Sequence, residues 1–207
     1  GYDDPDTVKA DAAERKRLVR AAWPVVLRSP MVWAMGGAYF ACKLIRYALL
    51  FWLPYYLHAA FGYSQGKSLD MSMAFDAGGI LFVVLAGFLA DRVFGRRRVA
   101  TAFGFMVLLV GAIYLYGAIG GISAGANVVG LLLVGGCLFA ADSLISGAVA
   151  QDLGGPHAAA LASGLINGIG SVGQVLQGFL LVWISDAYGW ETLFHVFAVT
   201  AALGSVC

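Results

Sequence analysis

The stretch from Met31 to Leu57 reads MVWAMGGAYFACKLIRYALLFWLPYYL and is the longest apolar run of the chain. Only Lys43 and Arg46 are charged in it, and no acid lies close in sequence to neutralise them. About 20 apolar residues suffice to cross a bilayer as a helix. A cation at the centre of such a helix costs roughly 2.5–3.5 kcal/mol to insert. Two cations within one turn indicate a need for positive charge inside the membrane, and the simplest use is to hold an anion during its passage.

The composition of the whole chain agrees with a membrane location. Hydrophobic residues make up 60% of it and charged residues 12%, with a mean hydropathy of +0.81. Soluble domains carry about 25% charged residues. We therefore expect an all-α integral membrane protein, with the lipid bilayer as its surroundings and no nucleic acid as a partner. The cysteines match neither metal spacing nor a secreted disulfide pattern, so we expect buried apolar side chains at Cys42, Cys137 and Cys207.

Hydropathy divides the chain into a charged N-terminal segment and a bundle of transmembrane helices. Polar stretches such as FGYSQGKS and GGISAGAN separate the apolar runs. We expect six spans, at about residues 31–57, 69–91, 99–119, 127–150, 158–185 and 192–207. The last holds only about 15 residues, short of a full crossing, which suggests a clipped C-terminus.

The basic residues of the loops predict the orientation of the bundle. They concentrate before the first span and after the second, where residues 92–98 contain four arginines. The loop after the first span has only Lys67, and those after the third and fifth have none. Positive residues favour the cytoplasmic side. Both ends are therefore expected in the cytoplasm of a multi-pass protein of the inner or plasma membrane.

Residues 1–30 differ in kind from the remainder. The acidic start, residues 3–6, resembles a flexible linker, whereas residues 7–28 fit a basic helix lying on the inner leaflet with Trp23 and Leu27 dipping into it. A tether whose charges only set topology remains an equal alternative.

The first span carries the candidate binding residues. Tyr39, Lys43, Arg46 and Tyr47 follow one another at i, i+4, i+7 and i+8, which places them on one helical face. A guanidinium offers a planar fork of donors and an ammonium a compact charge, and both suit a phosphate or a carboxylate. The phenol hydroxyls add further donors. These four residues are therefore predicted to bind an anionic small molecule.

Two acids in neighbouring spans offer an alternative use for the cations. With a rise of 1.5 Å per residue, Asp76 lies roughly 10 Å below the outer face, Arg46 16 Å, Lys43 21 Å and Asp142 22 Å. Lys43 and Asp142 are level, and Arg46 and Asp76 are within reach of long side chains, so this alternative predicts ion pairs of Lys43 with Asp142 and of Arg46 with Asp76. Such pairs would be structural, or would hold the cations while the site is empty.

The segment GFLADRVFGRRR, residues 87–98, is the second motif. Gly87 permits close helix approach, as small residues do in membranes. Asp91 lies at a helix C-terminus, where the dipole disfavours an anion, so we expect a basic residue or another helix's N-terminus beside it. With Arg92 and Arg96 this would form a conformational latch on the cytoplasmic side. A charged stop-transfer loop explains the arginines alone.

The fifth span is rich in glycine and amides. The pair Gly164 and Gly168 predicts close contact with a neighbouring helix. The amides are expected to form interhelical hydrogen bonds rather than to line a cavity, and they are Asn167, Gln174 and Gln177.

Several motifs resemble a known family. GFLADRVFGRRR is similar to the loop signature of the major facilitator superfamily, and KLIRYALLFWLPYYL resembles the seventh helix of its organophosphate:phosphate antiporters. FDAGGI and AVAQDLGG are similar to the sugar-phosphate exchangers of that group. The resemblance implies that Arg46 grips phosphate, that Lys43 matches a lysine of the exchanger branch, and that Asp76 stands where the family carries an acid. It departs from the family at Ala140-Ala141-Asp142, where Gly-Pro is common.

The resemblance implies twelve helices, so the six here would be the C-terminal half, with residues 1–30 joining it to a missing N-terminal half. The expected activity is exchange of an organic phosphate, such as glycerol-3-phosphate or a hexose phosphate, for inorganic phosphate by alternating access. The alternatives are a proton-coupled anion symporter with Asp142 as proton carrier, and a sensor that binds sugar phosphates without transport. We expect no enzyme, no cofactor and no metal, since the histidines lack a nucleophile or ligand spacing around them.

Overall fold

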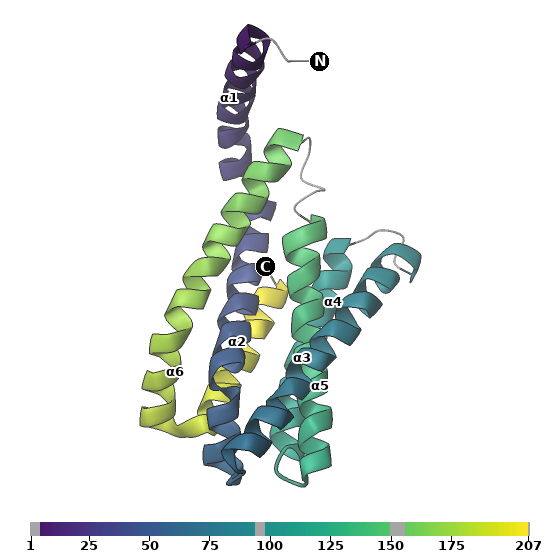
Figure 1. Cartoon of the computed structure of the whole chain (residues 1–207), viewed down its shortest axis with the longest axis vertical. Helices are drawn as coiled ribbons and strands as arrows, with labels where there is room; N and C mark the ends of the chain where they lie inside the picture. Colours follow the sequence, from purple (N-terminus) through teal and green to yellow (C-terminus); the bar gives the residue numbers. More distant parts are fainter. Residues whose placement is uncertain (1–4, 94–97, 150–155, 207) are drawn as a thin grey trace.

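The computed structural model describes residues 5–93, 98–149 and 156–206. Figure 1 shows a bundle of long helices, and the described residues contain no strand. The elements are α1 (Pro5–Arg28), α2 (Pro30–Phe61), α3 (Gln65–Phe88), η1 (Leu89–Val93), α4 (Arg98–Ile119), α5 (Ala124–Ser143), η2 (Leu144–Val149) and α6 (Pro156–Val206). The two π-helical turns η1 and η2 continue α3 and α5. α6 bends at Gly189, whose φ of +81° is outside the helical range, so it runs through the bundle twice.

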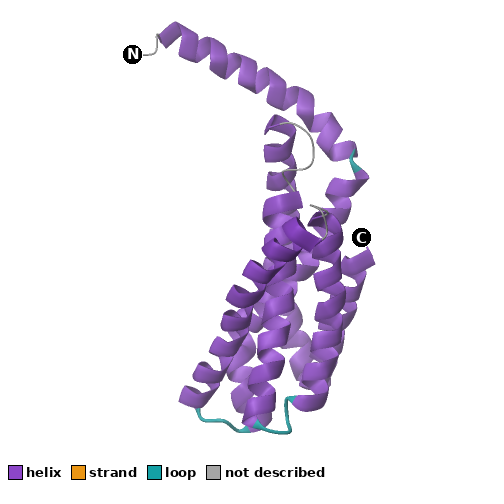
Figure 2. Cartoon of the chain, turned by 90° about the vertical axis from the view of Figure 1, so that its right-hand side faces the viewer, coloured by secondary structure: helices purple, strands orange, loops and turns teal. Residues whose placement is uncertain are grey.

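Local capping explains where the helices turn. α2 ends at Gly62, whose φ of +67° is a left-handed conformation that glycine adopts readily. Ser64 and Ser123 cap α3 and α5 by accepting hydrogen bonds from the backbone N–H of Lys67 and Ala126. These turns fall in the polar stretches that the sequence marked as ends of spans. Figure 2 places them at the end of the bundle opposite α1.

Among the described residues, four helical segments are long and apolar enough to cross a membrane: Gln65–Arg92, Arg98–Ile119, Ala124–Gly147 and Ala159–Val206. The last of these, with 48 residues, is long enough for two crossings around its bend. α2 has 32 residues, but Lys43 and Arg46 lower its hydropathy. It nevertheless packs inside the bundle against α6, α3 and α5. Counting α2 once and the last segment twice would give six crossings, and the six predicted spans with their bounds stay a prediction.

The N-terminal helix begins earlier than the sequence predicted. Pro5 and Asp6 belong to α1 and not to a flexible linker, while Asp3 and Asp4 lie outside the described residues. α1 extends beyond the bundle, and only its last turns pack against it (Figure 2). There Val26 is buried and Trp33 Nε1 donates a hydrogen bond to the Leu27 carbonyl. Whether α1 lies on a membrane surface stays a prediction.

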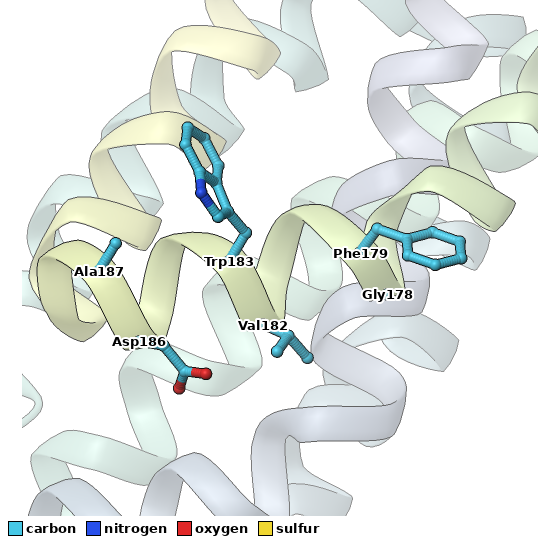
Figure 3. Close-up of a pocket in the computed structure, with 6 residues that line it drawn as sticks. All are labelled: Gly178, Phe179, Val182, Trp183, Asp186 and Ala187. Carbon is cyan, nitrogen blue, oxygen red and sulfur yellow. The ribbon is translucent and has the colours of Figure 1, made fainter.

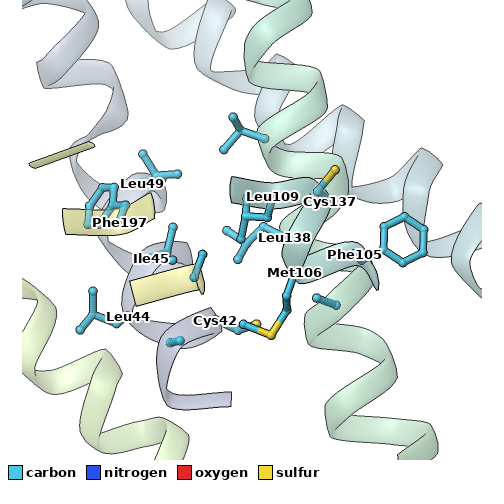
Figure 4. Packing of buried hydrophobic residues seen from close by; sticks show 14 of the residues in the cluster. Cys42, Leu44, Ile45, Leu49, Phe105, Met106, Leu109, Cys137, Leu138 and Phe197 are labelled. Atoms are coloured by element: carbon cyan, nitrogen blue, oxygen red, sulfur yellow. The ribbon is translucent and has the colours of Figure 1, made fainter. Parts of the chain in front are cut away.

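The centre of the bundle is an apolar core between α2, α4, α5 and the second part of α6. Figure 4 shows the side chains that meet there, among them Cys42, Ile45, Met106, Leu138 and Phe197. Cys42 and Cys137 are free and buried, as predicted, whereas Cys207 lies outside the described residues.

Close helix contacts occur at glycines other than those predicted. Gly78 of α3 faces the carbonyl oxygen of Leu132, and Gly135 of α5 faces that of Phe75, so a Cβ at either position would collide with backbone. By contrast, the positions around Gly87, Gly164 and Gly168 are open, and the predicted close approach there is wrong. A small-xxx-small spacing identifies a smooth helix face, but it does not show whether a neighbouring helix packs against that face.

Candidate functional site

Arg46 and Asp142 form an ion pair between α2 and α5. Arg46 Nη1 donates to Asp142 Oδ2 over 2.7 Å. The guanidinium carbon also lies 4.1 Å from the ring centroid of Phe139, one turn before Asp142 on the same helix. The Asp142 side chain is 9% exposed and that of Arg46 29%. The pair is therefore buried on the acid's side and still open on the arginine's side.

Lys43 has a different set of partners, and in the described part of the chain none of them is an acid. Its Nζ donates to Asn167 Oδ1 over 2.7 Å and to Ser171 Oγ over 3.1 Å, both on α6. The same nitrogen lies 5.0 Å from the ring centroid of Tyr39. Lys43 is buried, and neutral dipoles together with an aromatic face replace the water that its charge has lost.

The charges at this level of the bundle do not cancel. Lys43 and Arg46 are two cations, and Asp142 is the one acid in ion-pair contact with either of them in the described part of the chain. One positive charge therefore remains without a counter-ion. A buried charge without a partner is costly, and an anionic ligand would supply the missing one.

Both predicted ion pairs are wrong. Asp142 pairs with Arg46 rather than with Lys43, and Asp76 is exposed, with no ion pair among the described residues. The depth estimate counts residues along each helix, whereas the choice of partner also depends on the direction of the side chain around the helix axis. Phe75 packs into the α3–α5 contact, so Asp76, about 100° further round the helix, points elsewhere.

The two tyrosines of the predicted face separate in the structure. Tyr39 is buried beside Lys43. Tyr47 is half-buried, and its ring lies 6.0 Å from that of Phe51. No hydrogen bond joins Tyr47 to either cation within the described residues. The structure thus brings Tyr39 to the site but gives Tyr47 no contact there.

Three residues of the site were missed from the sequence as cation partners. They are Phe139, Asn167 and Ser171. Asn167 was expected to make an interhelical hydrogen bond, and this is confirmed, with Lys43 as donor. Ser171 lies one turn beyond Asn167 and donates to its carbonyl oxygen over 2.9 Å. The i, i+4 spacing of these two polar residues in an apolar helix was the available signal.

Two atoms of the ion pair keep unused hydrogen-bonding capacity. Arg46 Nε and Asp142 Oδ1 are buried without a partner among the described residues. Buried polar atoms are normally satisfied. A ligand oxygen could accept from Arg46 Nε, and a proton or a donor could satisfy Asp142 Oδ1. The pair is therefore able to exchange partners without losing all its contacts.

The motif of residues 87–98 is partly as predicted. Asp91 in η1 lies 3.7 Å from Nη2 of Arg98, the first residue of α4, so the expected basic partner at another helix's N-terminus is confirmed. Arg92 lies over the ring of Phe88 at 5.8 Å. Arg96 lies outside the described residues. A role as a latch remains a prediction.

A separate hollow of about 720 Å³ lies on α6, away from the cations. Figure 3 shows that its walls come from one stretch of that helix. Asp186 is its one charged residue, and the remainder are Gly178, Phe179, Val182, Trp183 and Ala187. Without a cation in its walls it does not suit an anion.

Comparison with known proteins agrees with this fold. The family described as Major Facilitator Superfamily matches residues 2–178. The chain is 36% identical over 194 residues to "Putative glycerol-3-phosphate transporter 2" of Arabidopsis thaliana, covering 88% of this chain and 37% of that protein. It is 34% identical over 187 residues to "Glucose-6-phosphate exchanger SLC37A1" of Mus musculus, covering 86% and 34% respectively.

A solved structure, described as the in meso crystal structure of the POT family transporter PepTSo, has a TM-score of 0.74 to this chain. It covers 86% of this chain and 37% of that one, and at 16% identity it supports the fold alone. The chain thus spans little more than a third of the length of the relatives it matches. The apolar helices, the family match and these relatives lead to one conclusion: the chain belongs to the major facilitator superfamily, among relatives named as glycerol-3-phosphate transporters and glucose-6-phosphate exchangers.

Proposed function

We propose that this chain is the C-terminal half of a secondary transporter for an organic phosphate, such as glycerol-3-phosphate or a hexose phosphate. The observation that carries the proposal is the unbalanced positive charge of Lys43 and Arg46 beside Asp142. The names of the relatives supply the substrate class. A phosphoryl group matches both a guanidinium fork and an ammonium.

In this proposal Lys43 supplies the uncompensated positive charge of the empty site, because its hydrogen-bond partners are neutral. Arg46 completes the site when the substrate competes with Asp142 for its guanidinium. The ring of Tyr39, whose centroid lies 5.0 Å from Lys43 Nζ, helps to hold the ammonium in place. The remaining contacts to the substrate come from the N-terminal half, which the greater length of the relatives implies.

The transport cycle is proposed to be exchange for inorganic phosphate by alternating access, with both ends of the chain in the cytoplasm. Release of Asp91 from Arg98 would free the cytoplasmic ends of α3 and α4 during the cycle. The protein would carry substrate without altering it, and so would not be an enzyme.

The test is uptake by the full-length protein in vesicles loaded with phosphate. Labelled glycerol-3-phosphate and glucose-6-phosphate are offered to wild type, Lys43→Gln and Arg46→Ala. Lys67→Gln is the matched control, since Lys67 lies over the ring of Tyr63 near the start of α3. We expect both site variants to lose uptake and the control to keep it. If Arg46→Ala transports as well as wild type, the assignment is wrong. Saturable binding without uptake by wild type would indicate a sensor.

A second mode, proton-coupled symport, is favoured by Asp142. The carboxylate is buried, and its Oδ1 has no hydrogen-bond partner in the described part of the chain. A protonated Asp142 would release Arg46 to the substrate, coupling proton uptake to anion binding. Uptake should then follow an imposed pH gradient, and Asp142→Asn should abolish that dependence. An unchanged pH dependence in the variant would remove this mode.

A further inference from the structure

A second cavity lies at the loop end of the bundle, between α2, α4 and the second part of α6. Its volume is about 520 Å³, within the usual range for small-molecule sites. Tyr56, one of its wall residues, stands ten positions after Arg46 on α2, roughly 15 Å along the helix. The cavity is therefore separate from the proposed phosphate site.

Aromatic rings form most of the wall. The ring of Tyr56 lies 5.2 Å from that of Trp190, 5.0 Å from that of Phe194 and 5.6 Å from that of Phe61. Tyr116 is 5.4 Å from Phe194. These contacts come from three helices that are distant in sequence, so the tertiary fold assembles the cluster. The faces of aromatic rings attract cations through their quadrupole.

The charge in the wall is negative, which favours a cation. Glu191 lines the cavity and is exposed. No Lys or Arg lines the cavity, and no ion pair of Glu191 is present among the described residues. His195 also lines it, with its ring 5.9 Å from that of Tyr114. An anion would meet an unpaired carboxylate here, whereas a cation would meet that carboxylate and several aromatic faces.

We propose that this cavity binds an organic ammonium group, with Glu191 as its counter-ion and Tyr56, Trp190 and Phe194 as its aromatic walls. The group belongs either to a free amine in the outer medium or to a phospholipid headgroup. Both sources reach this place, because the cavity opens at an end of the bundle.

The experiment uses purified full-length protein in a maltoside detergent, which contains no ammonium group. Tryptophan fluorescence is followed during titration with choline, with NaCl as the salt control, and with 3,3-dimethyl-1-butanol, the uncharged shape analogue of choline. We expect saturable binding of choline, and binding of the analogue weaker by about tenfold. Trp190→Phe should remove most of the signal change.

Glu191→Gln should weaken choline binding about five- to tenfold and leave the analogue unaffected. Asp186→Asn, just before the bend of α6, is the matched control and should change neither. A second pair, Tyr114→Leu in the wall and Tyr188→Leu outside it, tests the aromatic contribution at two exposed positions. The proposal is overturned if choline does not saturate, if the analogue binds equally well, or if Glu191→Gln binds choline like wild type.

The source of the ammonium follows from short-chain lipids added below micelle formation. Dihexanoyl phosphatidylcholine binding more tightly than choline, with no binding of the phosphatidylglycerol analogue, would identify a lipid headgroup. Equal affinity for choline and the phosphatidylcholine would identify a free amine. Equal binding of the phosphatidylglycerol and phosphatidylcholine lipids would reject ammonium recognition.

Discussion

Asn167→Asp places a carboxylate where Lys43 now meets a neutral amide, and it tests the charge argument directly. The side chain keeps its size, so the contact of 2.7 Å to Lys43 Nζ can be retained. The unbalanced positive charge of the site would then be neutralised. We expect the variant to fold, because it adds an ion pair at a position that is already hydrogen-bonded.

The size of the effect follows from the geometry. A phosphate oxygen about 4 Å from Lys43 gains about 4 kcal/mol at an effective dielectric constant of 20. Asn167 is exposed on its side of α6, so solvent screens the new charge, and we expect a loss of about 1–3 kcal/mol of substrate binding. This corresponds to an increase in KM of about five- to 150-fold.

The assay is concentration-dependent uptake by the full-length protein in phosphate-loaded vesicles. Gln174→Glu is the control, because it adds the same charge to α6 seven positions later, where no contact with Lys43 exists in the described structure. The reasoning is refuted if Asn167→Asp keeps the KM of wild type. It is equally refuted if Gln174→Glu raises the KM as much as Asn167→Asp does.

Three further predictions concern stability and the pair of Asp91 with Arg98. Arg46→Gln should destabilise by about 3 kcal/mol, since it strands a buried carboxylate, whereas Asp142→Asn, which leaves a more exposed arginine, should cost about 1–2 kcal/mol. The stability of both variants is measured by heating them with a fluorogenic maleimide, which reacts with the buried thiols of Cys42 and Cys137 once the protein unfolds. Equal losses of stability in the two variants would contradict the expected difference. In the same assay Gly135→Ala should cost about 2–3 kcal/mol through its backbone collision, while Gly87→Ala should be neutral or stabilising by up to about 1 kcal/mol. Asp91→Asn should change thermal stability by less than about 1 kcal/mol, because the pair is exposed, yet should alter the uptake rate if the latch opens in each cycle.

The fold could be predicted from the sequence largely because membrane insertion imposes a one-dimensional constraint. Each crossing must be long, apolar and helical, and the polar breaks that end it are visible as short motifs. Gly62 ends α2 and Ser64 caps the start of α3, both within the polar stretch FGYSQGKS. The bend at Gly189 likewise falls in the gap between the predicted spans 158–185 and 192–207. Helix starts differ by a few residues, since the termini extend beyond the hydrocarbon core.

The partners of the site could not be predicted in the same way, because they depend on how each helix is rotated about its axis. Lys43 and Arg46 lie three positions apart, which separates them by about 60° around α2. That angle suffices to direct Lys43 to α6 and Arg46 to α5. Hydropathy carries no information about which neighbour stands on either side. Close contacts such as those of Gly135 and Gly173 with the backbone of a neighbouring helix are part of what fixes that arrangement.

This division of the two cations has a consequence for how an anion would bind. A substrate that contacts both Lys43 and Arg46 must sit between α5 and α6, where Asp142 already occupies the Arg46 fork. Binding therefore requires Arg46 to leave Asp142 at least in part. The Arg46 side chain is 29% exposed, which gives it room to turn. The movement would loosen the contact of α2 with α5 while the contact of α2 with α6 through Lys43 holds. A substrate that exchanges one of these contacts for its own thereby biases the relative position of the helices, which is the coupling that a transporter needs between binding and conformational change.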